Sequence, residues 1–310
     1  MQVRTGTARR RIAADDPAKS ADLEIYYEDM GDENHPPVLL IMGLGAQLLL
    51  WRKEFCEKLV DQGLRVIRYD NRDVGLSSKL TGQRSNAGLL PSLVRSFLGR
   101  RSPAVYTLED LADDAAALLD HLGIDRTHIV GASMGGMIAQ IFAAKFPQRT
   151  QTLGIIFSSN NQAFLPPPGF PQLRALLQRP TGTTQEAIVE NLVRVAKVIG
   201  SPGFPRSDDK LRADALEGYE RAYYPAGIAR HFGAVLGSGS LRHYDRLITA
   251  PTVVIHGKAD KLMRPFGGRA IARAIKGARL VLIDGMAHDL PEELWDQIVG
   301  ELKTNFAEAR

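Results

Sequence analysis

The sequence predicts an α/β fold: a mostly parallel central sheet flanked by helices, with an inserted helical cap. In the first half of the 310-residue chain, short segments typical of strands alternate with segments typical of helices, as expected for parallel strands joined by helices. A long helical stretch without a convincing strand then interrupts this alternation, which resumes afterwards. We therefore expect a flexible N-terminal segment over residues 1–20, a core formed by residues 21–161 and 246–310, and a helical cap over residues 162–245.

The predicted strands differ in how they are buried. Leu23–Glu28 alternates apolar and polar residues like an edge strand, whereas Val38–Met42 is a continuous apolar run, which indicates burial on both faces of the sheet. The same kinds of short run predict the remaining strands, at residues 65–70, 127–130, 152–157, 252–256 and 279–284.

The predicted helices fill the intervals between strands. Gly63 ends the first helix, and Thr107 supplies an N-cap for the second. The segment Leu89–Arg101 is apolar with basic residues between; it predicts a short helix over the mouth of a pocket, the alternative being a surface that touches a membrane or an apolar substrate. Apart from the segment Leu89–Arg101, the helices are expected at residues 51–62, 107–122, 136–146, 187–199, 268–275 and 291–307, of which the first two are those that Gly63 ends and Thr107 caps.

Composition narrows the functional classes. Hydrophobic residues at 44% and charged residues at 24% are ordinary for globular proteins, and a net charge of +4 without a dense basic block argues against nucleic-acid binding. No run of about 18 apolar residues occurs, so stable membrane insertion is not expected. The single cysteine, Cys56, cannot form an internal disulfide; it fits a cytoplasmic location and reads as a small hydrophobic residue on a helix. No cluster has the spacing of metal ligands, so neither a metal nor another cofactor is expected.

The motif Gly131-Ala132-Ser133-Met134-Gly135 is the strongest functional signal. A β-branched strand segment precedes it and a helical segment ending at Pro147 follows it. A serine between glycines on a strand–turn–helix is a nucleophile elbow, in which the turn is so tight that only glycine fits at its flanks, two residues before and two residues after the serine. The pattern therefore predicts that Ser133 is a nucleophile.

A serine nucleophile requires a histidine base and an orienting carboxylate, which in a parallel sheet lie beyond the carboxyl ends of later strands. His288 and Asp260 occupy such positions, after the last and the preceding strand, and the order Ser133, Asp260, His288 is the one that accompanies this elbow. His256 lies too close to its strand end, and Asp289 is the weaker candidate for the acid. The other histidines are expected at the surface or in loops: His35, His121, His128, His231 and His243.

An oxyanion that forms at the reacting carbonyl needs two fixed hydrogen-bond donors. The first expected donor is the backbone N–H of Met134, at the start of a helix whose dipole also favours negative charge. The second is expected from the loop after the Val38–Met42 strand, with Leu44 N–H as the first choice and Gly43 as the second. The alternative is that the glycines of this loop only permit a tight turn.

These residues resemble the α/β-hydrolase superfamily over about residues 20 to 308. Four segments carry the resemblance: Gly131–Gly135, Asp70–Ser77, His256–Asp260 and Gly285–His288. Met42-Gly43 stands where His-Gly commonly precedes the oxyanion loop, a version similar to the aclacinomycin methylesterase-like branch of small bacterial esterases. The resemblance implies the α/β-hydrolase fold with residues 162–245 as its cap.

Together the residues and the resemblance predict a serine esterase that cleaves carboxylic esters through an acyl-enzyme. A C–C bond hydrolase, a lactonase or a perhydrolase would use the same three residues and stays an alternative. Ser133 argues against relatives with an aspartate nucleophile, and Met134 argues against a proline iminopeptidase, where tryptophan is typical. From a different class, the fold can also serve as a non-catalytic small-molecule receptor.

The expected substrate is a small apolar ester. Aromatic residues of the cap either line its pocket or form the core of the cap itself; the candidates are Phe164, Phe170, Tyr223, Tyr224 and Phe232. A homodimer is one alternative for the oligomeric state, which nothing in the sequence decides.

Overall fold

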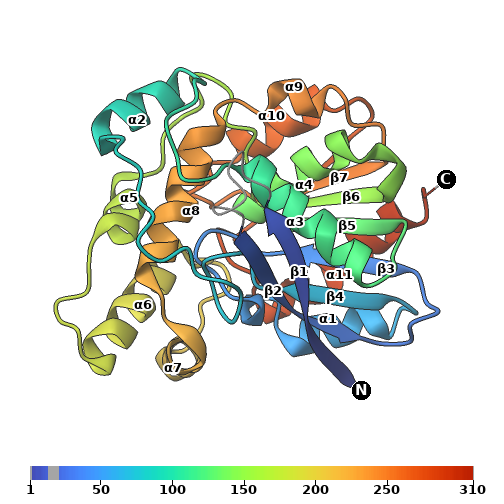
Figure 1. Cartoon of the computed structure of the whole chain (residues 1–310), viewed down its shortest axis with the longest axis horizontal. Helices are drawn as coiled ribbons and strands as arrows, with labels where there is room; N and C mark the ends of the chain where they lie inside the picture. Colours follow the sequence, from blue (N-terminus) through green and yellow to red (C-terminus); the bar gives the residue numbers. More distant parts are fainter. Residues whose placement is uncertain (1, 13–20, 310) are drawn as a thin grey trace.

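The computed structural model describes residues 2–12 and 21–309, which form an eight-stranded sheet of order β1-β2-β4-β3-β5-β6-β7-β8 (Figure 1). Strand β2 pairs antiparallel with β1 and β4, and the strands from β4 through β8 pair parallel. The strands are β1 Val3–Ile12, β2 Ala21–Met30, β3 Pro37–Ile41, β4 Arg65–Tyr69, β5 Thr127–Ala132, β6 Thr150–Ile156, β7 Thr252–Gly257 and β8 Arg279–Ile283. The predicted fold class is confirmed, and each predicted strand is present, as β2 to β8. The segment Leu23–Glu28, expected to resemble an edge strand, is not at the edge, because β1 pairs with β2 on its outer side.

Helices cover both faces of the sheet and enclose two apolar cores (Figure 1). Successive residues of β3 alternate between the cores: Leu39 and Ile41 point into one, Val38 and Leu40 into the other, and all four are fully buried. This burial on both faces is why the strand is a continuous apolar run. The first core contains α3 (Leu108–His121), α4 (Met134–Lys145) and α10 (Phe266–Ala274), and the second contains α1 (Lys53–Val60) and α11 (Trp295–Phe306).

A run of helices between β6 and β7 lies to one side of the sheet, at the left in Figure 1, and forms the predicted cap. Two of its helices begin with side-chain caps: Thr184 accepts a hydrogen bond from Ala187 N–H, and Ser207 accepts one from Lys210 N–H. The helices on this side are α5 Phe170–Leu177, α6 Gln185–Ile199, α7 Asp208–Ala222 and α8 Pro225–Ser238. The short α9, Arg242–Asp245, also lies between β6 and β7 in the chain, but it packs beside α10 and α4 at the top in Figure 1. The predicted limits of the cap, residues 162 and 245, stay a prediction.

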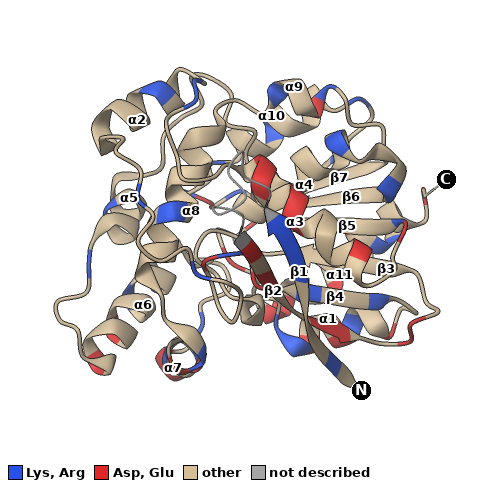
Figure 2. Ribbon diagram, viewed as in Figure 1, with Lys and Arg blue, Asp and Glu red and all other residues tan. Residues whose placement is uncertain are grey.

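The N-terminal segment requires a correction. Residues 1–20 were expected to be flexible, but Val3–Ile12 forms β1, which pairs with β2 along its whole length. Its side chains are held by charge: Arg4 Nε lies 3.2 Å from Asp29 Oδ2, and Arg10 Nη1 lies 2.5 Å from Asp114 Oδ1 on α3. Figure 2 shows basic positions of β1 beside acidic positions of α3. An edge strand held by backbone pairing and ion pairs has no apolar run, so the hydrophobic pattern missed it. Residues 13–20 lie outside the described residues.

The short helix predicted within Leu89–Arg101 is present as α2 (Leu89–Phe97). Several of its apolar side chains are exposed, Leu90 the most at 71%. In the described part of the chain, no helix is long and apolar enough to cross a membrane.

Candidate active site

Ser133 lies in the sharp turn between β5 and α4, with a positive φ of 56°, which is unusual for a residue other than glycine. The turn leaves no room at its flanks. A Cβ on Gly131 would lie 2.2 Å from the carbonyl oxygen of Gly135, and one on Gly135 would lie 2.0 Å from the carbonyl oxygen of Ile41. Both positions therefore require glycine, and the geometry is that of the predicted elbow.

The structure brings Ser133, His288 and Asp260 together in one line of hydrogen bonds. Ser133 Oγ lies 2.9 Å from His288 Nε2, and His288 Nδ1 lies 2.7 Å from Asp260 Oδ2. Asp260 follows β7 and His288 follows β8, so both come from loops at the carboxyl ends of parallel strands. The carboxylate can accept from Nδ1–H, which leaves Nε2 free to accept the proton of the serine hydroxyl.

Asp260 is buried and held ionised by its surroundings. Its Oδ1 accepts hydrogen bonds from Leu262 N–H at 2.8 Å and Met263 N–H at 2.9 Å. Burial alone would raise the pKa of Asp260, but the neighbouring His288 and the hydrogen bonds from His256 and His288 outweigh it and hold this pKa well below its usual range. The carboxylate is therefore available to hold the imidazole and to stabilise its cation.

The two rival residues lie elsewhere. His256 Nε2 lies 2.5 Å from the carbonyl oxygen of Met263 and 3.5 Å from Asp260 Oδ2, so it supports the acid rather than the serine. Asp289 accepts a hydrogen bond from the hydroxyl of Ser201, a residue after cap helix α6. The geometry thus favours His288 and Asp260 over His256 and Asp289.

Contacts from the cap and the core fix the loop that carries His288. Its backbone N–H donates to the carbonyl oxygen of Ile199, at the end of α6, over 3.0 Å. The ring of Phe157, which follows β6, lies against the imidazole with centroids 4.7 Å apart. Sequence reasoning did not find these supports, because contacts between distant segments leave no local pattern.

The expected oxyanion donors lie around Ser133. Met134 is the first residue of α4, so its N–H has no acceptor within the helix. Gly43 faces the serine closely: a Cβ there would lie 3.0 Å from Ser133 Cβ and 3.4 Å from its Oγ. Among the described residues, the N–H of Leu44 has no hydrogen-bond acceptor, while the next one, of Gly45, donates to His231 Nδ1 at 3.0 Å.

His231 lies in a different position from the one that the sequence predicts. It was expected at the surface or in a loop, but it lies within α8 and is fully buried, and His128 is buried as well. Burial lowers the pKa of each of the two imidazoles to about 4. Cys56 is the buried helix residue that was predicted, and burial raises the pKa of its thiol to about 12, which suits a packing residue.

The predicted aromatic residues of the cap have different surroundings. Phe164 is 70% exposed and packs edge-on against Phe97 of α2, with centroids 5.5 Å apart. Tyr223 packs against Tyr219, and the hydroxyl of Tyr224 accepts a hydrogen bond from Arg230. Phe170 is exposed and Phe232 is half-buried. Their role in substrate binding stays a prediction. In the described part of the chain, no group of three or more His, Cys, Asp or Glu side chains could hold a metal ion.

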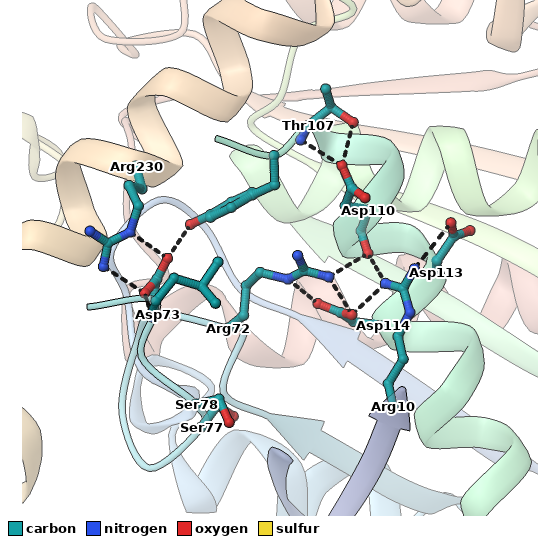
Figure 3. Close-up of polar contacts among 12 residues, drawn as sticks. Arg10, Arg72, Asp73, Ser77, Ser78, Thr107, Asp110, Asp113, Asp114 and Arg230 are labelled. Carbon is teal, nitrogen blue, oxygen red and sulfur yellow. Dashed lines mark hydrogen bonds and ion pairs between the residues drawn. The ribbon is translucent and has the colours of Figure 1, made fainter. Parts of the chain in front are cut away.

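Buried ion pairs join the cap to the loop after β4. Asp73 binds Arg230 of α8 through two contacts of 2.8 and 2.7 Å and also accepts the hydroxyl hydrogen of Tyr106 at 2.8 Å (Figure 3). Asp70, in the same loop, pairs with Arg221 of α7 at 2.8 Å. Helices α7 and α8 of the cap are therefore fixed to the loop after β4 by charge as well as by packing.

Replacing Asp73 by Asn is expected to lower the free energy of unfolding by about 3 kcal/mol, because it leaves Arg230 largely buried without its counter-charge. Urea unfolding at neutral pH measures this loss. Lys210→Ala is the matched control: it removes an exposed ion pair between α7 and Glu292, which is expected to cost less than about 1 kcal/mol. Equal losses in the two variants would show that the Asp73–Arg230 pair does not hold the cap.

Comparisons with known proteins agree with the observed fold. A family model described as alpha/beta hydrolase fold matches residues 36–293. The chain is 30% identical over 298 residues to rhodomycin D methylesterase DauP of Streptomyces sp. (strain C5), covering 87% of this chain and 90% of that protein. It is 26% identical over 273 residues to 3-oxoadipate enol-lactonase 2 of Acinetobacter baylyi, covering 87% and 88%. Among solved structures, it resembles 2-hydroxy-6-oxo-6-phenylhexa-2,4-dienoate hydrolase from Rhodococcus sp. strain RHA1, with a TM-score of 0.71, 17% identity, and 99% of this chain and 100% of that chain covered.

Proposed function

The chain belongs to the alpha/beta hydrolase fold family, and on that premise we propose that it is a serine esterase that cleaves carboxylic esters through an acyl-enzyme. The observation that carries the proposal is the line of hydrogen bonds from Ser133 Oγ to His288 Nε2 and from His288 Nδ1 to Asp260, at 2.9 and 2.7 Å. A hydroxyl, an imidazole and an ionised carboxylate in this order form the catalytic triad of serine hydrolases.

In the proposed mechanism, His288 removes the proton from Ser133 as its Oγ attacks the ester carbonyl. The N–H groups of Met134 and Leu44 hold the oxyanion of the tetrahedral intermediate. His288 then gives the proton to the departing alcohol, which leaves an acyl group on Ser133. A water molecule deprotonated by His288 releases the acid, while Asp260 stabilises the imidazolium in both halves of the reaction.

The substrate class follows from the relatives and from the cap. A relative with 30% identity over most of both chains is named a methylesterase, which supports an ester of a small alcohol. We propose a small apolar acyl group, for which Phe164, Tyr223, Tyr224 and Phe232 of the cap region are the candidate contacts. The enol-lactonase among the similar proteins supports a lactone as the second candidate. A C–C bond stays an alternative, because its cleavage would use the same three residues.

We expect the purified protein to hydrolyse p-nitrophenyl acetate and butyrate faster than the palmitate ester, because Ser133 is half-buried and His288 largely buried. A series of acyl lengths, run beside labelling with a fluorophosphonate, measures this. Stoichiometric labelling without turnover of any ester would favour the lactone or C–C alternative. A folded protein that neither turns over esters nor reacts with the fluorophosphonate would contradict a serine hydrolase and favour a receptor.

A further inference from the structure

We propose that His231, on cap helix α8, is a positioning residue for the oxyanion site: it holds the Leu44–Gly45 peptide so that Leu44 N–H points toward the reacting carbonyl. The inference rests on the proposed function. In this proposal the cap contributes to catalysis, because His231 of the cap fixes the position of Leu44 N–H, a hydrogen-bond donor of the core.

The imidazole of His231 bridges two loops of the core. Its Nδ1 lies 3.0 Å from the backbone nitrogen of Gly45, and its Nε2 lies 2.8 Å from the carbonyl oxygen of Arg72. A backbone N–H only donates and a carbonyl only accepts. His231 must therefore be neutral, with its hydrogen on Nε2 and its lone pair on Nδ1 directed at Gly45.

The anchor on the Arg72 side is itself rigid. The guanidinium of Arg72 binds the carboxylate of Asp114, on α3, through two contacts of 2.6 Å, and both side chains are buried (Figure 3). Tyr106 packs edge-on against the imidazole, with ring centroids 6.3 Å apart. A continuous line of contacts thus runs from α3 through Arg72 and His231 to Gly45, next to Leu44.

Helix α8 packs closely against the loop after β3, which contains Gly45. Gly45 has a φ of +66°, and a Cβ there would lie 2.8 Å from a side-chain carbon of Ile228, one turn before His231. On the other side of the loop, the side-chain amide of Asn71 donates to the carbonyl oxygen of Met42 at 3.1 Å. The Gly43–Leu44 peptide, which carries the Leu44 N–H, is held by Ala46, whose N–H donates to the carbonyl oxygen of Gly43 at 3.3 Å. The Leu44–Gly45 peptide is held by His231, which accepts from Gly45 N–H. Both peptides that flank Leu44 are therefore fixed, the second of them by the cap.

The charges around His231 are compatible with a neutral ring. Burial is the main cause that lowers its pKa to about 4, and the nearby cations Arg72 and Arg230 act in the same direction. The hydrogen bond to the carbonyl of Arg72 and the carboxylate of Asp73 act in the opposite direction, with smaller effect. The acceptor at Nδ1 is thus kept through the neutral pH range.

Two substitutions separate the two hydrogen bonds of His231. In His231→Asn, the amide oxygen can take the place of Nδ1 and accept from Gly45 N–H. In His231→Gln, the amide nitrogen can take the place of Nε2 and donate to Arg72, but nothing accepts from Gly45. Losing an oxyanion donor costs about 10²- to 10³-fold in kcat, so a displaced one is expected to cost about 10- to 100-fold.

We expect His231→Gln to lower kcat for p-nitrophenyl butyrate about 10- to 100-fold with KM changed less than about threefold, and His231→Asn to keep most of kcat. Affinity for a trifluoromethyl ketone, which forms an anionic tetrahedral adduct on serine, should fall in parallel with kcat. Three outcomes would overturn the inference: a rise in KM with kcat unchanged, an equal fall of kcat in the two variants, or no fall of kcat in either. Thermal unfolding of both variants checks that they are folded.

The wild-type protein supplies a test that needs no folded variant. With nitrogen-15 in histidine and glycine, a scalar coupling across the Gly45 N–H to His231 Nδ1 hydrogen bond is expected at neutral pH, and a ring hydrogen on Nδ1 instead would overturn the inference. Ser133→Ala, assayed beside these samples, tests the proposed function separately. If Ser133→Ala abolishes turnover while His231→Gln does not lower it, the inference fails and the proposed function stands.

Discussion

Ser133→Ala is expected to lower kcat/KM for ester hydrolysis by at least about a thousandfold, because it removes the only hydroxyl in line with His288 among the described residues. The residual rate would come from binding and from the oxyanion donors, which do not require the serine oxygen. The measurement is p-nitrophenyl butyrate hydrolysis together with fluorophosphonate labelling, and both should be lost.

Ser158→Ala is the matched control for that experiment. Ser158 lies beside the elbow, and its hydroxyl donates to the carbonyl oxygen of Ser133 at 2.6 Å, so its loss disturbs the same turn without removing the nucleophile. We expect it to keep kcat within about tenfold of wild type. If Ser158→Ala were as inactive as Ser133→Ala, the effect would reflect a damaged turn rather than a missing nucleophile.

Asp260→Asn is expected to lower kcat by about 10⁴-fold while the fold stays intact. An amide can present its NH₂ group to His288 Nδ1, which places the ring hydrogen on Nε2. In that form His288 cannot accept the proton of Ser133, although the distances between the side chains stay nearly the same. Steady-state kinetics with p-nitrophenyl butyrate, beside a thermal unfolding curve, measures both parts of this expectation.

The comparison with Asp289→Asn decides which acid serves His288. Asp289 adjoins the histidine in sequence but bonds to Ser201, so its replacement is expected to change kcat by less than about tenfold. If Asp289→Asn lowered kcat more than Asp260→Asn does, the assignment of Asp260 as the acid would be wrong. The loop after β8 would then have to rearrange during the reaction.

The sequence was sufficient where the chemistry depends on local geometry. The elbow could be predicted because the turn requires Gly131 and Gly135, which lie within two residues of Ser133 in the sequence. A local motif therefore identifies it. Asp260 and His288 could be placed because parallel strands gather their carboxyl ends at one edge of the sheet. This is a property of the fold class, which the alternation of strands and helices predicts.

The features that were missed depend on partners distant in the chain. Asp73 and Arg230 are 157 positions apart. The two partners that make His231 a buried bridge, Gly45 and Arg72, are 186 and 159 positions away from it. A charged or polar residue has the same letter whether it is solvated or buried against a partner, so only tertiary structure reveals its role. Strand β1 was missed for the same reason, because backbone pairing and the ion pairs of Arg4 and Arg10 hold it.

The measurement that tests the central claim most directly is mass spectrometry of the protein quenched during turnover of p-nitrophenyl butyrate. The proposed mechanism predicts a butyryl group on the peptide that contains Ser133, and, when deacylation is the slower step, a burst of about one p-nitrophenol per active protein. Turnover without a burst would indicate that acylation is the slower step, so the site of acylation, rather than the burst, decides the question. An acyl group on another residue, or full activity in Ser133→Ala, would show that Ser133 is not the nucleophile.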